Sequence, residues 1–266
     1  MTNTTTIFRR EIIRLLVLVL FFSQATKTLA ERATIAVASN FQGTFKILAK
    51  EFRQYSEHDL RVIVASTGTL FNQITHGAPF DVLLAADSVH PEQLEKKGLG
   101  IRGSRFTYGI GRLALVLYQE REKPPNNQAS KKSEVLTDLL TRSSGKVAIA
   151  NPKFAPFGIA AQQTLEYLDL WDAIQPRLVL GANIAQSFQF VSTGNAGSGL
   201  VALSQVLSKE TPKKYWEIPT DWHQPIRQQA ILLQSGRNNK AALDFLNFLK
   251  KQQAKSIIKN QGYYNP

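Results

Sequence analysis

A short apolar run, then one or two hydroxyl, amide or glycine residues, then an amphipathic pattern: this unit occurs four times along the chain. The apolar runs cover residues 34–38, 61–65, 146–150 and 177–181. Short apolar runs predict strands, and apolar positions three and four residues apart predict helices. Each unit is therefore expected to carry a strand end directly into a helix start. Helix starts have unpaired N–H groups and a partial positive charge, so four of them at one cleft would suit an anion.

The same patterning predicts the fold class. Residues 82–86 form an apolar run between two aspartates, which is typical of a buried central strand. Alternating strands and helices predict an open α/β sheet, and the pattern restarts after residue 111. We therefore expect two α/β lobes, each a mostly parallel sheet flanked by helices. Lobe I would comprise residues 31–110 plus 227–266, and lobe II residues 111–226. The polar stretch 119–132 is expected to be a loop.

The first 30 residues have the pattern of an export signal. Three arginines precede an apolar core at residues 15–22, and small residues follow at 28–30. Eight apolar residues are too few to span a bilayer, which takes roughly 20. We expect cleavage after Ala30 and release of the remaining chain into the periplasm.

Composition excludes several functions. Cysteine is absent, so disulfides, thiolate metal sites and cysteine nucleophiles are excluded. The formal net charge is +12, but the basic residues are scattered, and nucleic-acid binding would need them clustered with aromatic residues. Ser204 lacks the glycines of a nucleophile elbow, and no glycine-rich phosphate loop ends in lysine. The four histidines, at 58, 76, 90 and 223, are expected at the surface. An enzyme is therefore not expected.

Five segments together carry a resemblance to a known family. They read AVASNF at 36–41, ASTGTL at 65–70, GAPFDVLLAAD at 77–87, ANPKFAPFG at 150–158 and NIAQSFQFVSTGNAGSGLVALS at 183–204. They resemble the periplasmic molybdate-binding proteins of ATP-binding-cassette transporters. The resemblance implies a type II periplasmic binding protein whose two lobes close on molybdate or tungstate. It also implies a monomer without cofactor or catalysis, which delivers the anion to a membrane permease and its ATPase subunit.

The resemblance also implies the ligand-binding residues. In that family neutral groups hold the oxyanion, and carried over by motif these groups belong to Ser39, Asn40, Ser66, Thr67, the amide of Phe157 and the amide of Ile184. No side chain would coordinate molybdenum directly, since the metal arrives as an oxyanion. We number the four strand-to-helix junctions in chain order, after residues 38, 65, 150 and 181. At the second junction, whether the Ser66 or the Thr67 hydroxyl faces the ligand stays open. Some members add a tyrosine hydroxyl where this chain has Ala202.

The chemistry of the four junctions fits a fully deprotonated dianion. Molybdate and sulfate carry no proton at neutral pH, so they bind to hydrogen-bond donors only. Phosphate keeps a proton, which a carboxylate in the site can accept. The junctions offer donors. The alternatives are a sulfate or other oxyanion carrier, an exported α/β hydrolase, or an envelope protein that uses its basic charge. The hydroxyl and amide residues could also serve only as helix N-caps.

Overall fold

The computed structural model describes residues 30–118, 132–142, 145–208 and 215–266, and Glu31–Pro266 form one compact unit. All of the predicted export signal except Ala30, and all of the predicted loop at 119–132 except Lys132, lie outside the described residues. No helix in the described part of the chain is long and apolar enough to cross a membrane.

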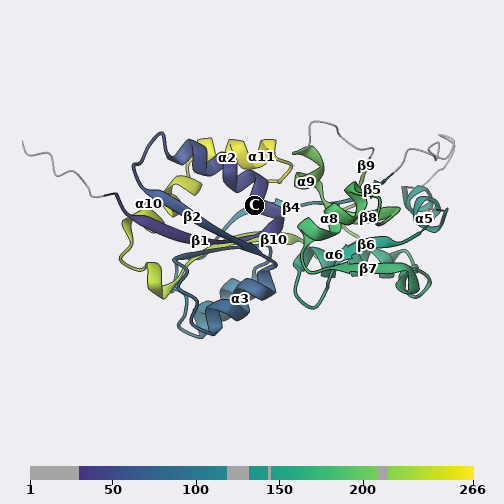
Figure 1. The fold of residues 1–266 in the computed structure, drawn as a ribbon, viewed down its shortest axis with the longest axis horizontal. Helices are drawn as coiled ribbons and strands as arrows, with labels where there is room; N and C mark the ends of the chain where they lie inside the picture. The colour runs from purple at the N-terminus through teal and green to yellow at the C-terminus, as the bar shows by residue number, and fades with distance from the viewer. Residues whose placement is uncertain (1–29, 119–131, 143–144, 209–214) are drawn as a thin grey trace, which may run out of the picture. The chain divides into compact units, whose positions relative to one another are not determined.

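The first of two five-stranded sheets has the strand order β2-β1-β3-β10-β4 (Figure 1). Strands β2, β1 and β3 run parallel, whereas β10 runs antiparallel to β3 and β4. The strands are β1 Arg32–Ala38, β2 Asp59–Ala65, β3 Val82–Ala85, β4 Phe106–Gly111 and β10 Ile226–Leu232. The helices with them are η1 Ser39–Phe41, α2 Gln42–Phe52, α3 Thr67–Thr75, α4 Val89–Lys96, η3 Gln234–Gly236, α10 Lys240–Leu249 and α11 Gln252–Asn260. We call this part lobe I.

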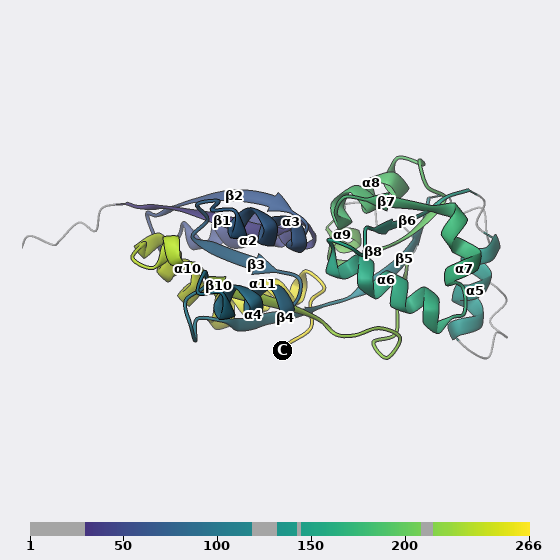
Figure 2. The same ribbon diagram turned by 90° about the horizontal axis from the view of Figure 1, so that it is seen from below.

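The second sheet has the order β7-β6-β8-β5-β9, and we call its part lobe II (Figure 2). Strands β7, β6 and β8 run parallel, whereas β5 runs antiparallel to β8 and β9. The strands are β5 Leu113–Leu117, β6 Val147–Ala150, β7 Leu178–Gly181, β8 Ser198–Ala202 and β9 Tyr215–Glu217. The helices are α5 Lys132–Arg142, α6 Pro156–Tyr167, α7 Trp171–Ile174, η2 Gln175–Arg177, α8 Ile184–Ser192 and α9 Leu203–Leu207.

Alternation along the strands places helices on both faces of each sheet. On β1, Ile35 and Val37 pack with α2, α10 and α11, whereas Ala36 packs with α3 and α4. On β5, Leu113 and Leu115 face α5 and α6, while Ala114 and Val116 face α8 and α9. Successive strand residues point to opposite faces, so both faces of each central strand are buried.

The predicted α/β architecture is confirmed, and each of the four recurring runs forms a strand that leads into a helix or, after β6 and β7, into a short turn and then a helix. The sheets are mixed, because the strands next to the two crossings run antiparallel to their neighbours. The apolar run at 230–233 predicts a further strand, but it covers only the last three residues of β10, which begins at Ile226 and ends at Leu232. The chain leaves lobe I at Arg112 and returns through residues 218–225. The lobe boundaries drawn from the sequence stay a prediction.

Candidate functional site

The predicted binding residues lie where strands end and helices begin. Ser39 and Asn40 open η1, Ser66 is the N-cap of α3, and Thr67 is its first residue. In lobe II, Phe157 is the second residue of α6 and Ile184 is the first of α8. All six are more than nine-tenths buried. First-turn N–H groups have no acceptor within their own helix, so the partners they do have define what each junction can still bind.

In the first turn of α3, one backbone donor remains after the hydrogen bonds are counted. The N–H of Gly68 donates to the Phe154 carbonyl oxygen at 2.9 Å, across to lobe II. The N–H of Thr69 donates to Ser66 Oγ at 3.3 Å, and that of Leu70 donates to the Ser66 carbonyl at 3.0 Å. The remaining first-turn N–H is that of Thr67.

Helix α6 leaves its donor at Phe157. Pro156 occupies the first position and has no N–H, while the N–H groups of Gly158 and Ile159 both donate to the Ala155 carbonyl, at 2.8 and 3.2 Å. Gly158 also lets the helix start approach β6, since a Cβ there would overlap the Ala150 carbonyl. The Phe157 side chain is buried in the lobe II core, so its N–H is the polar group that it contributes.

Helix α8 leaves its donor at Ile184. The side-chain oxygen of Asn183 accepts from the N–H groups of Ala185 and Gln186 at 3.0 and 3.1 Å. The N–H of Ser187 donates to the Asn183 carbonyl at 3.2 Å. This capping uses the other first-turn donors and leaves the N–H of Ile184.

At the first junction, the side chains of Ser39 and Asn40 differ. Both protons of the Asn40 amide are used, on Gln228 Oε1 at 2.8 Å and on the Tyr263 hydroxyl at 3.0 Å. An N–H donor from Asn40 would therefore be its backbone group. Ser39 lines a cavity of about 280 Å³ together with Ala185, the second residue of α8. The first and fourth junctions thus border the same cavity.

Contacts between the lobes bring the junctions into one neighbourhood. The Gly68 hydrogen bond to Phe154 joins the second junction to the turn before α6. Thr67 Oγ1 accepts from the Ala86 N–H at 3.0 Å, and Ala86 belongs to the same apolar cluster as Phe157 and Ile184. Ala38, which precedes Ser39, lies in that cluster too. The ends of strands from both sheets therefore meet here.

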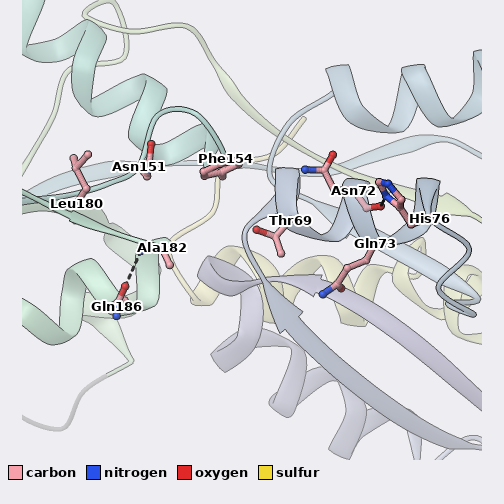
Figure 3. Close-up of a pocket in the computed structure, with 9 residues that line it drawn as sticks. All are labelled: Thr69, Asn72, Gln73, His76, Asn151, Phe154, Leu180, Ala182 and Gln186. Carbon is pink, nitrogen blue, oxygen red and sulfur yellow. Dashed lines mark hydrogen bonds between the residues drawn. The ribbon is translucent and has the colours of Figure 1, made fainter.

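A larger cavity of about 660 Å³ opens beside the second and third junctions (Figure 3). Helix α3 lines one side, and the turns after β6 and β7 with α8 line the other. The lining residues are Thr69, Asn72, Gln73, His76, Asn151, Phe154, Leu180, Ala182 and Gln186. Most of the polar groups among these residues are hydroxyls and amides, and the described lining includes no carboxylate, lysine or arginine.

Two of the predicted surface histidines are buried. His58 is 6% exposed, and its Nδ1 accepts from the Glu31 N–H at 3.0 Å. His223 is 8% exposed, and burial lowers its pKa. Neither fits the surface expectation, and for His58 the reason is contact with Glu31 and Asp244, which lie far away in the sequence. Within the described part of the chain, no group of three or more His, Cys, Asp or Glu side chains could hold a metal ion.

A buried polar network beside the first junction was not predicted. It contains Ser204, Gln228 and Tyr263, all less than one-tenth exposed, and it is centred on Asn40. Burial raises the pKa of Tyr263 to about 12, so its hydroxyl stays protonated. These residues come from three distant segments, and no local pattern in the sequence marks them as partners.

Comparison with known proteins adds evidence from the whole chain. Residues 33–264 match the family model of the bacterial extracellular solute-binding proteins. The molybdate-binding protein ModA of Azotobacter vinelandii is 42% identical over 237 residues, which cover 88% of this chain and 90% of that protein. ModA of Rhodobacter capsulatus is 37% identical, with 92% and 93% covered. A solved structure of the A. vinelandii periplasmic molybdate-binding protein superposes with a TM-score of 0.79 at 33% identity, covering 88% and 99% of the two chains.

Proposed function

Because the chain belongs to the bacterial extracellular solute-binding proteins and, among them, to the molybdate-binding proteins, we propose that it captures molybdate for an uptake transporter. It holds the anion between its lobes and releases it to a membrane permease that an ATPase subunit drives. It is a transport component and not an enzyme. Tungstate, which has the same charge and shape, is the expected second ligand.

The observation that carries this proposal is the pattern of unused donors. Three helix starts from both lobes each leave one backbone N–H, at Thr67, Phe157 and Ile184. A tetrahedral dianion with no proton accepts such donors at every oxygen, and the helix dipoles favour its charge. Each hydrogen bond to a charged acceptor contributes about 1.5–3 kcal/mol, so a few of them reach the roughly −8 kcal/mol of micromolar binding.

The hydroxyl groups of lobe I complete the proposed donor set. The Ser66 hydroxyl accepts from the Thr69 N–H, and the Thr67 hydroxyl accepts from the Ala86 N–H. Ser66 Oγ also lies 2.7 Å from Thr69 Oγ1, and with Thr69 as the donor of that bond the Ser66 and Thr67 hydroxyls each keep one proton for the ligand. Ser39 adds a further hydroxyl, and Asn40 adds its backbone N–H. Ala202 adds no hydroxyl to this set.

The rest of the proposal concerns the lobes and the location of the protein. Lobe I at 31–110 plus 227–266 and lobe II at 111–226 close around the anion. Cleavage after Ala30 releases a monomer into the periplasm. The protein uses no cofactor and binds no nucleic acid.

Isothermal titration calorimetry with molybdate, tungstate, sulfate and phosphate tests the function. We expect tight binding of molybdate and tungstate, weaker binding of sulfate because it is smaller, and none of phosphate because the donor set offers its proton no acceptor. Equal affinity for sulfate would make the protein a sulfate carrier. No binding of any of the four anions would refute an oxyanion carrier.

A further inference from the structure

Three polar groups form a closed ring of hydrogen bonds where the lobes meet. The side-chain amide of Asn40 donates to the Tyr263 hydroxyl at 3.0 Å. The Tyr263 hydroxyl lies 3.1 Å from Ser204 Oγ and 2.9 Å from the Asn40 carbonyl oxygen. Ser204 Oγ donates to the same carbonyl at 3.1 Å. Tyr263 is 2% and Ser204 is 6% exposed.

The direction of each bond follows from the number of protons. The Asn40 amide is only a donor through its nitrogen, so Tyr263 accepts there and has one proton left. That proton points to Ser204 Oγ or to the Asn40 carbonyl, which lie together. Ser204 in turn gives its single proton to the carbonyl. Every proton of the ring is used, and Gln228 Oε1 takes the second proton of the Asn40 amide at 2.8 Å.

The ring joins both lobes at the first junction. Ser204 lies on α9 of lobe II, whereas Asn40 lies on η1 and Tyr263 follows α11, both in lobe I. The segment after α11 packs closely on α9, since a Cβ at Gly262 would lie 2.8 Å from Leu207 Cδ1. Ser39, Asn40 and Ser204 line one cavity, which Ala185 also borders. The Ser204 hydrogen bond therefore ties lobe II to the turn that is proposed to bind the anion.

We propose that Ser204 is a positioning residue for the closed state: it borders the cavity, but it gives its proton to the Asn40 carbonyl and so holds the Ser39–Asn40 turn against lobe II instead of donating to the anion. This inference rests on the proposed function. In an open protein the Ser204 hydroxyl and the Asn40 carbonyl bind water instead, so their mutual bond favours closure. Apparent affinity scales with the fraction of the protein that is competent to bind, so losing this bond weakens binding.

Stopped-flow fluorescence with molybdate on the purified protein and its Ser204→Ala variant tests the inference. We expect dissociation to be about threefold to tenfold faster, as for the loss of one neutral hydrogen bond, with the association rate nearly unchanged. Ser208→Ala is the matched control, because this exposed serine directly after α9 borders the same cavity as Ser204 but donates its hydroxyl only within lobe II, to the Gln205 carbonyl. Its kinetics should equal those of the wild type.

Tyr263→Phe separates positioning from a local packing defect. It removes one member of the ring and leaves the Ser204 bond to Asn40, so its effect and that of Ser204→Ala should be less than additive in the double variant. Unchanged dissociation in Ser204→Ala, or equal changes of association and dissociation, would overturn the inference.

Small-angle scattering of the ligand-free proteins tests the role of Ser204 in closure without molybdate, so failure of this inference is distinguishable from failure of the proposed function. Ser204→Ala should have a larger radius of gyration than the wild type and Ser208→Ala, and equal radii would count against the inference. If the wild type binds none of the four oxyanions, the proposed function fails, while scattering still decides whether Ser204 favours closure.

Discussion

In lobe II the proposed donors belong to residues with apolar side chains, Phe157 and Ile184, whereas in lobe I they belong mainly to hydroxyl residues such as Ser39 and Thr67. Both apolar side chains are buried in the core of lobe II, while their N–H groups lie at helix starts. A backbone donor is placed by the helix and not by the identity of its side chain. A hydroxyl donor, by contrast, is lost with a single substitution. The two lobes therefore differ in how directly sequence determines their part of the site.

Removing a backbone donor of lobe II should have the largest effect. Ile184→Pro eliminates the N–H at the first position of α8, where proline is tolerated, and Asn183 already has the extended backbone that proline requires, with φ −155° and ψ 172°. We expect affinity for molybdate to fall by about tenfold to a hundredfold, as for the loss of a hydrogen bond to a charged acceptor.

Ile184→Ala is the control for this experiment, because it shortens the side chain and keeps the N–H. Calorimetry should give it nearly wild-type affinity, although it unfolds at lower denaturant concentration. If Ile184→Ala loses as much affinity as Ile184→Pro, the side chain and not the backbone donor matters, and the contrast between the lobes is wrong.

Closure between the lobes is the next target. A Cβ at Gly68 would lie 2.9 Å from the Phe154 carbonyl oxygen, so Gly68→Ala should strain the closed state while suiting α3 in the open state. Molybdate affinity should fall by about tenfold, equivalent to roughly 1.4 kcal/mol. Gly43→Ala on α2 is the control, since its Cβ would meet only Ser208 Cβ at 3.9 Å. Equal affinity of both variants would show that molybdate binding does not depend on the close approach of Gly68 to the Phe154 carbonyl.

Paired variants of lobe I should show which hydroxyl binds. Ser66→Ala and Thr67→Val each remove one hydroxyl, and the variant that loses the ligand contact should bind molybdate about tenfold more weakly. Ser66→Ala also removes an N-cap, which costs about 0.5–2 kcal/mol of stability. Asn239→Ala controls for this loss, because Asn239 caps α10. For all three variants, calorimetry gives the affinity for molybdate and urea unfolding gives the stability, so a lost ligand contact is distinguished from a lost N-cap. Wild-type affinity in both Ser66→Ala and Thr67→Val would mean that neither hydroxyl binds the anion and that the Thr67 N–H is the donor at this junction.

The smallest effect concerns His223 in the segment that returns to lobe I. Burial, as the largest cause, lowers the pKa of this ring below its usual 6.5. Protonation therefore favours the unfolded state, so this contribution to stability is present above about pH 6.5 and is lost as the pH falls toward the folded pKa. Between pH 7.5 and pH 5.5, the urea midpoint of the wild type should fall more than that of His223→Gln. An equal fall would mean that the ring does not titrate in this window.

The sequence predicts best what depends on local pattern. The four strand-to-helix units have clear apolar runs, and their order predicts both the alternation and the junctions. The start of β10 is missed because Gln228 and Gln229 read as surface residues, yet both are buried at the crossing. Partners from distant segments satisfy their amides. Sequence pattern does not carry that information.

The same limit applies to the neighbourhood of the site. Ser204 has no local feature that distinguishes it from a serine at the surface, and Tyr263 lies more than 200 residues from its partner Asn40. The burial of His58 likewise depends on contacts with Glu31 and α10. Residues that bind through their own backbone are predictable from helix starts. Residues that hold those helix starts in place become visible only in the fold.

Main-chain donors at Phe157 and Ile184 also bear on redesign of the protein as a sensor for another oxyanion. Except for proline, which removes the N–H, no exchange of side chains at these two positions alters the hydrogen-bonding group itself. Ligand preference in lobe II would have to be retuned by moving a whole helix, through substitutions in the core beneath it.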